Sequence, residues 1–157
     1  MKIKTLIILT FGLLVMAGCK SKKKTVATPD PRKSTVVEKD KIDNVQKGKA
    51  YDAGKRILMT CNTSKFKPFN STEATPTVIQ NTTQERLTKT CLKFRLKYGD
   101  FRDVQLVEVL HNKSDKSNIY RFKALYEKKI ANKELRVTMN EENKVSAIKS
   151  LDWVDKY

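Results

Sequence analysis

The sequence predicts an α+β domain in which N-terminal helices pack on a curved antiparallel four-stranded meander. Apolar residues recur with the spacing of an α-helix up to Tyr98, and the spacing changes to every second residue after Gly99. The alternating segments are separated by short polar loops, which favours antiparallel neighbours over parallel crossovers. Helices followed by consecutive strands indicate a sheet that wraps around the helices.

The first predicted helix covers residues 50–61, and a short second helix lies between residues 71 and 80. The second helix has two possible start positions, because either Asn70 or Thr75, with Pro76 after it, would cap it. The first helix is indicated by an apolar face that recurs at helical intervals. This face consists of Ala50, Ala53, Ile57, Leu58 and Cys61.

A third helix is expected over residues 84–98. Thr82-Thr83-Gln84-Glu85 has the pattern of a capping box, in which a hydroxyl and a carboxylate bind free backbone N–H groups. Gly99 is a typical residue just after a last helical turn. The expected apolar face consists of Leu87, Cys91, Phe94 and Tyr98.

Four strands are expected after Gly99, over residues 101–111, 119–127, 134–140 and 144–153. The first has apolar residues on both faces, and the second alternates most clearly. Residues 140–143 are typical of a hairpin turn. The spacing of Val145 and Ile148 departs from strict alternation, which predicts a β-bulge in the last strand. In the first strand Val104, Leu106 and Leu110 would share one face, and Val107 and Val109 the other.

The N-terminus has the composition of a processing signal, assigned to residues 1–18. The uncharged stretch from Thr5 to Gly18 would span about 21 Å as a helix, short of the ~30 Å hydrocarbon core of a bilayer. It is therefore typical of a secretory signal and not of a permanent membrane helix. Met16-Ala17-Gly18-Cys19 resembles the lipobox of bacterial lipoproteins, with Met16 where leucine is commoner. The resemblance implies cleavage after Gly18 and lipid attachment to Cys19.

Residues 19–49 are predicted to be the lipidated cysteine and a basic flexible tether, followed by the α+β domain over residues 50–157. From Lys20 to Lys49 there are ten Lys or Arg and four Asp or Glu, with few large apolar residues. Such a segment cannot bury enough apolar surface to fold alone. It is expected to act as a spacer, with adhesion to anionic lipid headgroups as a compatible second role. The lysines for that role are Lys20, Lys22, Lys23 and Lys24.

The order of elements over residues 48–154 resembles the cystatin-like, nuclear transport factor 2-like superfamily, particularly small uncharacterised domains of bacterial lipoproteins. The resemblance is carried by the two long helices, the junction Tyr98-Gly99-Asp100-Phe101, and the strands 135–140 and 143–148. It implies that sheet and helices can enclose a ligand pocket. Five aromatic residues could line such a pocket. The alternative, which we favour, is that they form the core instead. The residues in question are Phe94, Tyr120, Phe122, Tyr126 and Trp153.

Cys61 and Cys91 lie thirty residues apart, each on the apolar face of its predicted helix. Export would permit a disulfide between them, worth about 3–4 kcal/mol in the chain-entropy model. Two separate buried thiols are an equal alternative. A catalytic thiol is not expected, because His111 is the one histidine that could activate it.

The sequence contains no catalytic constellation, metal-ligand cluster or cofactor motif. We interpret His111 as an exposed loop residue. The leading hypothesis is a lipid-anchored envelope protein, in the outer membrane of a Gram-negative cell because Lys20 stands where an inner-membrane retention signal has Asp. Its non-catalytic domain would bind a small ligand or a protein. The alternatives are a hydrolase- or isomerase-like enzyme on the same fold, and a basic surface that binds anionic glycan or lipid. No motif for sequence-specific nucleic-acid binding accompanies the net charge of +16.

Overall fold

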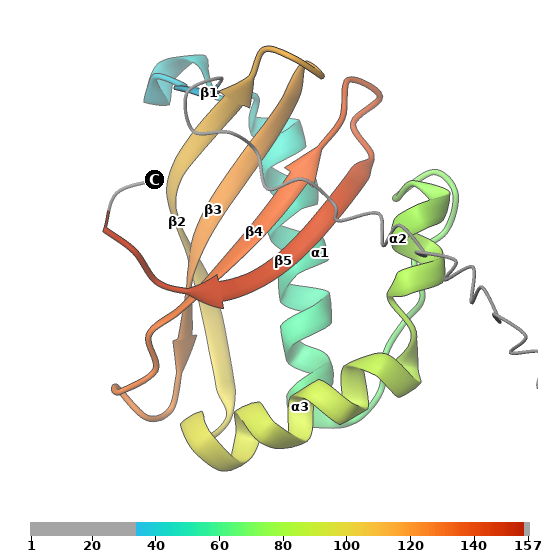
Figure 1. Cartoon of the computed structure of the whole chain (residues 1–157), viewed down its shortest axis with the longest axis vertical. Helices are drawn as coiled ribbons and strands as arrows, with labels where there is room; N and C mark the ends of the chain where they lie inside the picture. The colour runs from blue at the N-terminus through green and yellow to red at the C-terminus, as the bar shows by residue number, and fades with distance from the viewer. Residues whose placement is uncertain (1–33, 156–157) are drawn as a thin grey trace, which may run out of the picture.

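The computed structural model describes residues 34–155. Within this range, helices cover one face of a five-stranded antiparallel sheet with the order β1-β2-β3-β4-β5, so every strand pairs with its neighbours in the sequence (Figure 1). The elements are β1 (Ser34–Val36), the 3-10 helix η2 (Lys39–Lys41), α1 (Asn44–Thr63), α2 (Pro76–Asn81), α3 (Gln84–Tyr98), β2 (Phe101–Asn112), β3 (Ser117–Tyr126), β4 (Lys133–Met139) and β5 (Val145–Asp152).

The predicted α+β class is confirmed, but the prediction of four strands and of helices at the N-terminus is wrong. β1 precedes the helices and pairs with the end of β2, with Ser34 opposite Asn112. A three-residue strand is too short to show a period in the sequence, so it was not predicted. β1 lies inside the segment assigned to the tether, and residues 34–49 therefore belong to the fold.

α1 also begins earlier than predicted, at Asn44 instead of residue 50. Asp43 caps the helix, because its side chain accepts hydrogen bonds from the backbone N–H groups of Val45 (2.8 Å) and Gln46 (3.1 Å). Ala50, Ala53, Ile57 and Leu58 of the predicted apolar face are buried, whereas Cys61 is half-buried and bonded to α3. Gly54 allows close packing there, since a Cβ at this position would lie 2.7 Å from Cδ2 of Leu135 on β4.

The two helices that follow are flanked on both sides by threonine or glycine cap residues. α2 starts after Thr75, one of the two predicted start positions. At α3 the cap is Thr83, whose hydroxyl accepts a hydrogen bond from the backbone of Arg86 (3.4 Å), so the predicted capping box does not form in that register. Gly99, with a φ of 75°, ends α3 as predicted.

Two bulges decide which side chains of the sheet face the helices. In β2 the pairing shifts between Leu106 and Glu108, which leaves Val107 as the extra residue. Val109 therefore joins Val104 and Leu106 in the core, and the prediction that Leu110 shares their face is wrong. In β5 the predicted bulge is confirmed, because the partners of Thr138 and Met139 are Ala147 and Val145, with Ser146 between them.

Candidate functional site

A cavity of about 260 Å³ lies between α1, α3 and strands β4 and β5. Its volume is close to the lower end of the range of small-molecule sites, roughly 300–1,000 Å³. The side chains of its wall are apolar and come from both layers of the fold. They are Ile57 and Leu58 of α1, Leu87 and Phe94 of α3, Leu135 of β4 and Ile148 of β5.

Polar groups of the cavity are confined to its rim. The exposed side chains of Asn81, Thr90 and Ser150, together with half-buried Thr82, mark the mouth. The amide of Asn81 is engaged with Arg86 and Thr77, whereas the hydroxyls of Thr82 and Ser150 form no hydrogen bond within residues 34–155. None of the described residues that line the cavity has an ionisable side chain. The cavity therefore suits a neutral ligand with an apolar body and a polar group at the mouth.

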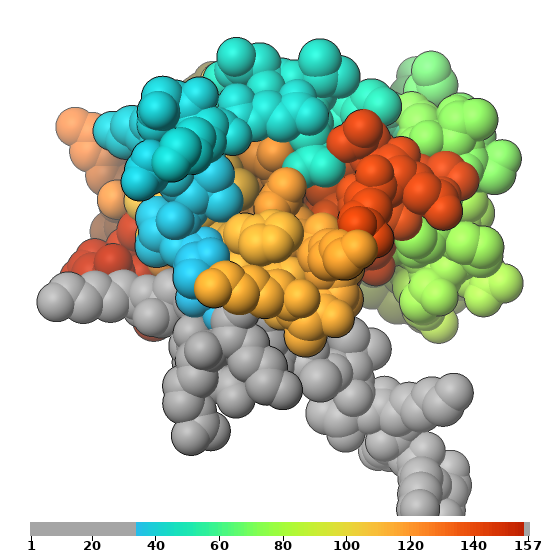
Figure 2. All heavy atoms as spheres, turned by 90° about the horizontal axis from the view of Figure 1, so that it is seen from above, coloured from blue at the N-terminus to red at the C-terminus, as the bar shows by residue number. Residues whose placement is uncertain are grey.

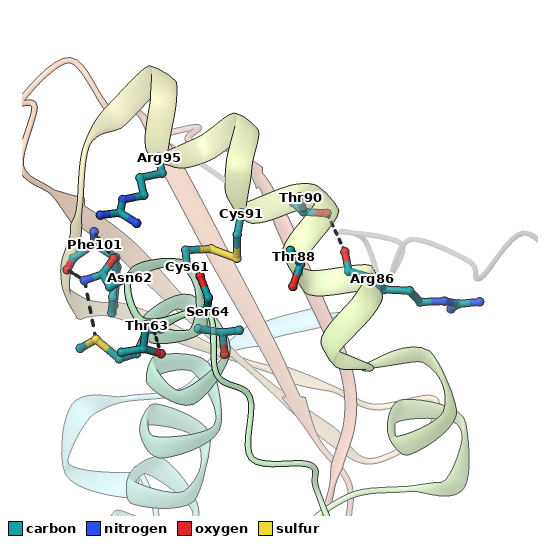
Figure 3. Close-up of a disulfide and its surroundings, with 12 residues drawn as sticks. Cys61, Asn62, Thr63, Ser64, Arg86, Thr88, Thr90, Cys91, Arg95 and Phe101 are labelled. Carbon is teal, nitrogen blue, oxygen red and sulfur yellow. Dashed lines mark hydrogen bonds between the residues drawn. A yellow bond between two sulfur atoms is a disulfide. The ribbon is translucent and has the colours of Figure 1, made fainter.

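A disulfide joins Cys61 of α1 to Cys91 of α3 in the wall of the cavity (Figure 3). Their Cα atoms are 4.6 Å apart, within the normal span of a disulfide. The next residue, Asn62, is also fixed: its side chain donates to the carbonyl of Phe101 (2.7 Å) and accepts from the N–H of Phe101 (2.9 Å). The end of α1 is thus tied to both α3 and β2, which fixes one side of the cavity.

The five aromatic residues considered as a pocket lining do not line one pocket. Phe94 lines the cavity, whereas Tyr120, Phe122 and Tyr126 are buried in the core between helices and sheet. Burial raises the pKa of Tyr120 to about 12, and its hydroxyl donates to Oε1 of Gln46 (2.9 Å). Trp153 lies beside a different site, on the face of the sheet that the helices do not cover.

That outer face carries a buried network of charged side chains. Arg121 of β3 and Glu134 of β4 are both 0% exposed. Nε and Nη2 of Arg121 donate to the two carboxylate oxygens of Glu134, at 2.8 and 2.7 Å. Arg121 also donates to Glu108 of β2, and Arg136 donates to Glu134. The sequence pattern missed this network, because alternation assigns these positions to a solvated face.

The network also holds the C-terminal segment. Nη2 of Arg121 donates to the carbonyl of Val154 (2.9 Å), and the guanidinium lies 5.2 Å from the centre of the Trp153 ring. Burial acts to raise the pKa of Glu134, but hydrogen bonds from Arg121 and Arg136 outweigh it and the pKa lies below its ordinary value. Glu134 stays ionised at neutral pH, so we interpret the network as structural.

A groove on the other side of α1 contains a second paired arginine. The guanidinium of Arg56 donates to both carboxylate oxygens of Glu73 (3.1 and 2.6 Å) and lies 4.7 Å from the centre of the Phe69 ring. Hydrogen bonding from Arg56 lowers the pKa of Glu73 to about 2. The groove has a volume of about 330 Å³, but its principal charged groups neutralise each other.

His111, the last residue of the predicted strand 101–111 and interpreted as an exposed loop residue, lies within β2 and is half-buried. At this end β2 pairs on both sides, with Asn112 opposite Ser34 of β1 and opposite Ser117 of β3. Nδ1 of His111 lies 2.9 Å from Oδ1 of Asn118, and His111 is not among the residues that line the cavity. Within residues 34–155, no group of three or more His, Cys, Asp or Glu residues is arranged to hold a metal ion.

The lipobox, with Cys19, and the tether lysines Lys20, Lys22, Lys23 and Lys24 lie outside the described residues. In the described part of the chain, no helix has the length and apolar character needed to cross a membrane. Comparison with known proteins gives no match to any family model, curated protein or solved structure.

Proposed function

We propose that the chain is a lipid-anchored envelope protein whose domain binds a small, neutral, largely apolar ligand in the cavity between α1 and α3. The observation that carries this proposal is the cavity itself, with apolar side chains in its wall and hydroxyl groups at its rim. Burial of apolar ligand surface would supply affinity at about 25 cal/mol per Å². The rim hydroxyls of Thr82 and Ser150 would orient the polar group of the ligand.

The walls of the cavity support binding without rearrangement. The Cys61–Cys91 disulfide holds α1 and α3 together, and a rigid site loses less conformational entropy when a ligand binds. The role is non-catalytic in this proposal. The non-catalytic role is supported by the positions of the ionisable side chains. Glu73 and Glu134, which are paired with arginines, lie outside the cavity, and so does His111.

The anchor is proposed from the sequence. Met16-Ala17-Gly18-Cys19 supports lipid attachment at Cys19, and attachment by two or more acyl chains holds a protein stably on a membrane. We place the protein in the outer membrane of a Gram-negative envelope, since Lys20 stands at the position of the inner-membrane retention signal. Helices on one face of an antiparallel sheet support a relationship to the cystatin-like, nuclear transport factor 2-like superfamily.

Ligand binding is tested with the neutral fluorophore N-phenyl-1-naphthylamine, whose emission rises in apolar surroundings. We expect saturable binding that Leu87→Trp weakens at least about tenfold, because the larger ring occupies the cavity. Leu92→Trp is the matched control: it makes the same change on the exposed face of the same helix and should leave binding unchanged. Ser150→Leu narrows the mouth from β5 and covers the case in which Leu87→Trp fails to fold. Equal affinity in all three variants would refute the proposed site.

The anchor is tested separately by metabolic labelling with a fatty-acid analogue in a Gram-negative host. The unmodified chain should incorporate the label and sediment with the outer membrane, and Cys19→Ser should do neither. Cys61→Ser is the control for the loss of a cysteine as such. Label on the Cys19→Ser chain would contradict the assignment.

A further inference from the structure

The outward face of α3 combines exposed leucines with lysines. Leu92 and Leu96, one helical turn apart, are 65% and 73% exposed. Lys93 lies between them, and the opposite side of the helix is buried through Cys91 and Tyr98. Because Leu92 and Leu96 are exposed, they do not contribute to the core of the domain.

The loop between β3 and β4 extends the same surface. It runs beside the C-terminal end of α3 (Figure 1), and the backbone N–H of Lys128 donates to the carbonyl of Tyr98 (3.0 Å). Nζ of Lys128 lies 3.4 Å from the carbonyl oxygen of Leu96. Ile130, in the same loop, is 73% exposed. We call the surface made by these two segments the α3 face; it consists of Leu92, Lys93, Leu96, Lys128, Lys129 and Ile130.

The charged residues of the α3 face are all lysines. α3 contains five basic residues and one acidic residue, Glu85. Glu85 is paired with Lys89 (2.8 Å), and Lys93, Lys128 and Lys129 take part in no ion pair within residues 34–155. A second copy of the chain would bring like charges together, so self-association through this face is disfavoured. A surface with regularly spaced anions and an accessible apolar layer is its complement.

We propose that the α3 face docks the domain onto membranes that contain anionic lipids. Leu92, Leu96 and Ile130 would enter the interface between headgroups and acyl chains, while Lys93, Lys128 and Lys129 contact lipid phosphates. This is the usual division of labour in interfacial helices, whose apolar face is shallowly inserted and whose lysines meet anionic headgroups. Each lysine near such a surface is expected to change membrane partitioning about fivefold.

The position of the α3 face is compatible with an anchor at Cys19 but does not require one. β1 and α3 lie at opposite ends of the molecule, separated by the length of α1, about 30 Å for its 20 residues (Figure 1). The residues from Cys19 to Lys33 can span at most about 50 Å. An anchored chain is therefore long enough for the far end of the domain to reach the same membrane.

The test uses the unlipidated chain from Lys20 to Tyr157, which keeps all helices and strands described for residues 34–155, so that the outcome is independent of the proposed anchor. Sedimentation with vesicles of phosphatidylcholine mixed with phosphatidylglycerol should show binding that pure phosphatidylcholine vesicles lack. Lys93→Glu with Lys129→Glu should reduce the partition coefficient by at least about twentyfold. Leu92→Ser with Leu96→Ser should also weaken binding, with net charge unchanged.

The matched control reverses two exposed lysines at the opposite end of the molecule, Lys39→Glu with Lys113→Glu. Figure 2 views this end, where the segment of β1 and η2 lies beside the β2–β3 hairpin. Both double variants change the net charge equally. An equal loss of binding would show that overall charge and the tether lysines, and not the α3 face, carry the attraction, and would overturn the proposal. Binding that neither the lysine nor the leucine variants reduce would also overturn it, and would leave the face to a protein partner.

Insertion is measured with an added indole. Leu96→Trp should show blue-shifted emission and quenching by brominated acyl chains on mixed vesicles. Val36→Trp places the same probe at a comparably exposed position (64%) far from α3 and should show neither change. An unquenched indole at position 96 would contradict docking through this face. Circular dichroism and retention of the Cys61–Cys91 disulfide verify that each variant is folded.

Discussion

The two faces of the sheet are buried by opposite means. On the helix-covered face, apolar side chains form the core and leave a cavity of about 260 Å³ between α1 and α3. On the outer face, Arg121 and Glu134 are equally inaccessible, yet their polar atoms have partners in the sheet and the C-terminal segment.

In this protein, therefore, the buried charged side chains do not mark the candidate functional site. A buried charge in a protein often marks an active site, but here the charged face is the well-satisfied one and the apolar face is the one that is incompletely filled. The outer network ties β2, β3 and β4 to the chain terminus, whereas the cavity is maintained by a covalent bond between two helices. Mutations on the two faces should therefore act on different properties.

The largest expected effect is the loss of Glu134. Glu134→Ala leaves the guanidinium of buried Arg121 without its main partner, and breaking a buried pair in this way costs about 3–5 kcal/mol of unfolding free energy. Urea unfolding followed by circular dichroism measures the change. Glu85→Ala, which removes the exposed partner of Lys89, is the control and should cost less than about 0.5 kcal/mol. Similar small effects in both variants would mean that Arg121 and Glu134 do not form a buried ion pair.

Removal of the disulfide should rank second. Cys61→Ala with Cys91→Ala opens a loop of thirty residues and is expected to lower the unfolding free energy by about 3–4 kcal/mol in the chain-entropy model. Affinity for the fluorophore should fall as well, because α1 and α3 would no longer be fixed. Mass spectrometry of the unreduced chain gives the direct check. Two alkylatable thiols in the folded protein would exclude the bridge.

The partly exposed pair of Arg56 and Glu73 should contribute less than the buried one, about 0.5–1 kcal/mol. Hydrogen bonding from Arg56 lowers the pKa of Glu73 from 4.5 to about 2 in the folded state, so this stabilisation is present above pH 4.5 and is lost as the pH falls towards 2. The difference in stability between the unmodified chain and Glu73→Gln should be constant near neutral pH, shrink below pH 4.5 and vanish only below pH 2. A difference that grows on acidification would reverse the assigned sign.

The smallest expected effect is a gain. Leu87→Phe adds apolar volume to the cavity and should raise the unfolding free energy by about 0.5–1 kcal/mol, at the lower end of the range for cavity filling. Val78→Phe, in the closely packed core beneath α2, is the contrasting change and should destabilise through overpacking. If both variants lose stability to the same degree, the cavity is not open to added side-chain atoms.

Much of the fold could be predicted because its longer elements have clear periods. The apolar faces of α1 and α3, the stop at Gly99 and the bulge in β5 all follow from spacing and from glycine. The early start of α1 has a local signal in Asp43, a preferred N-cap residue. The burial of Gln46 could not be predicted, since its hydrogen-bond partners Asn118 and Tyr120 lie more than seventy residues away. Burial of a polar residue by distant partners leaves no local pattern.

The candidate site was predicted less well than the fold. Phe94 is the one residue of the five aromatic candidates that lines the cavity, and the cavity depends on the gap between α1 and α3, which no single segment encodes. The outer network has one weak signal in the sequence. Glu108 lies directly opposite Arg121 on the adjacent strand, and opposite charges across adjacent strands favour pairing. Glu134 is two residues from Arg136, which is the residue opposite Arg121 on β4.

The two edges of the sheet carry a consequence for aggregation. An open edge strand offers unpaired N–H and C=O groups to other chains. On one side β1 covers the end of β2, and the bulges at Arg102 and Val107 interrupt the rest of that strand. On the other side β5 exchanges hydrogen bonds with the segment before α2, through Val145 with Glu73 and Thr75. Short covers and bulges at both edges make strand addition by a neighbouring chain unfavourable, so the sheet is protected against aggregation through its edges.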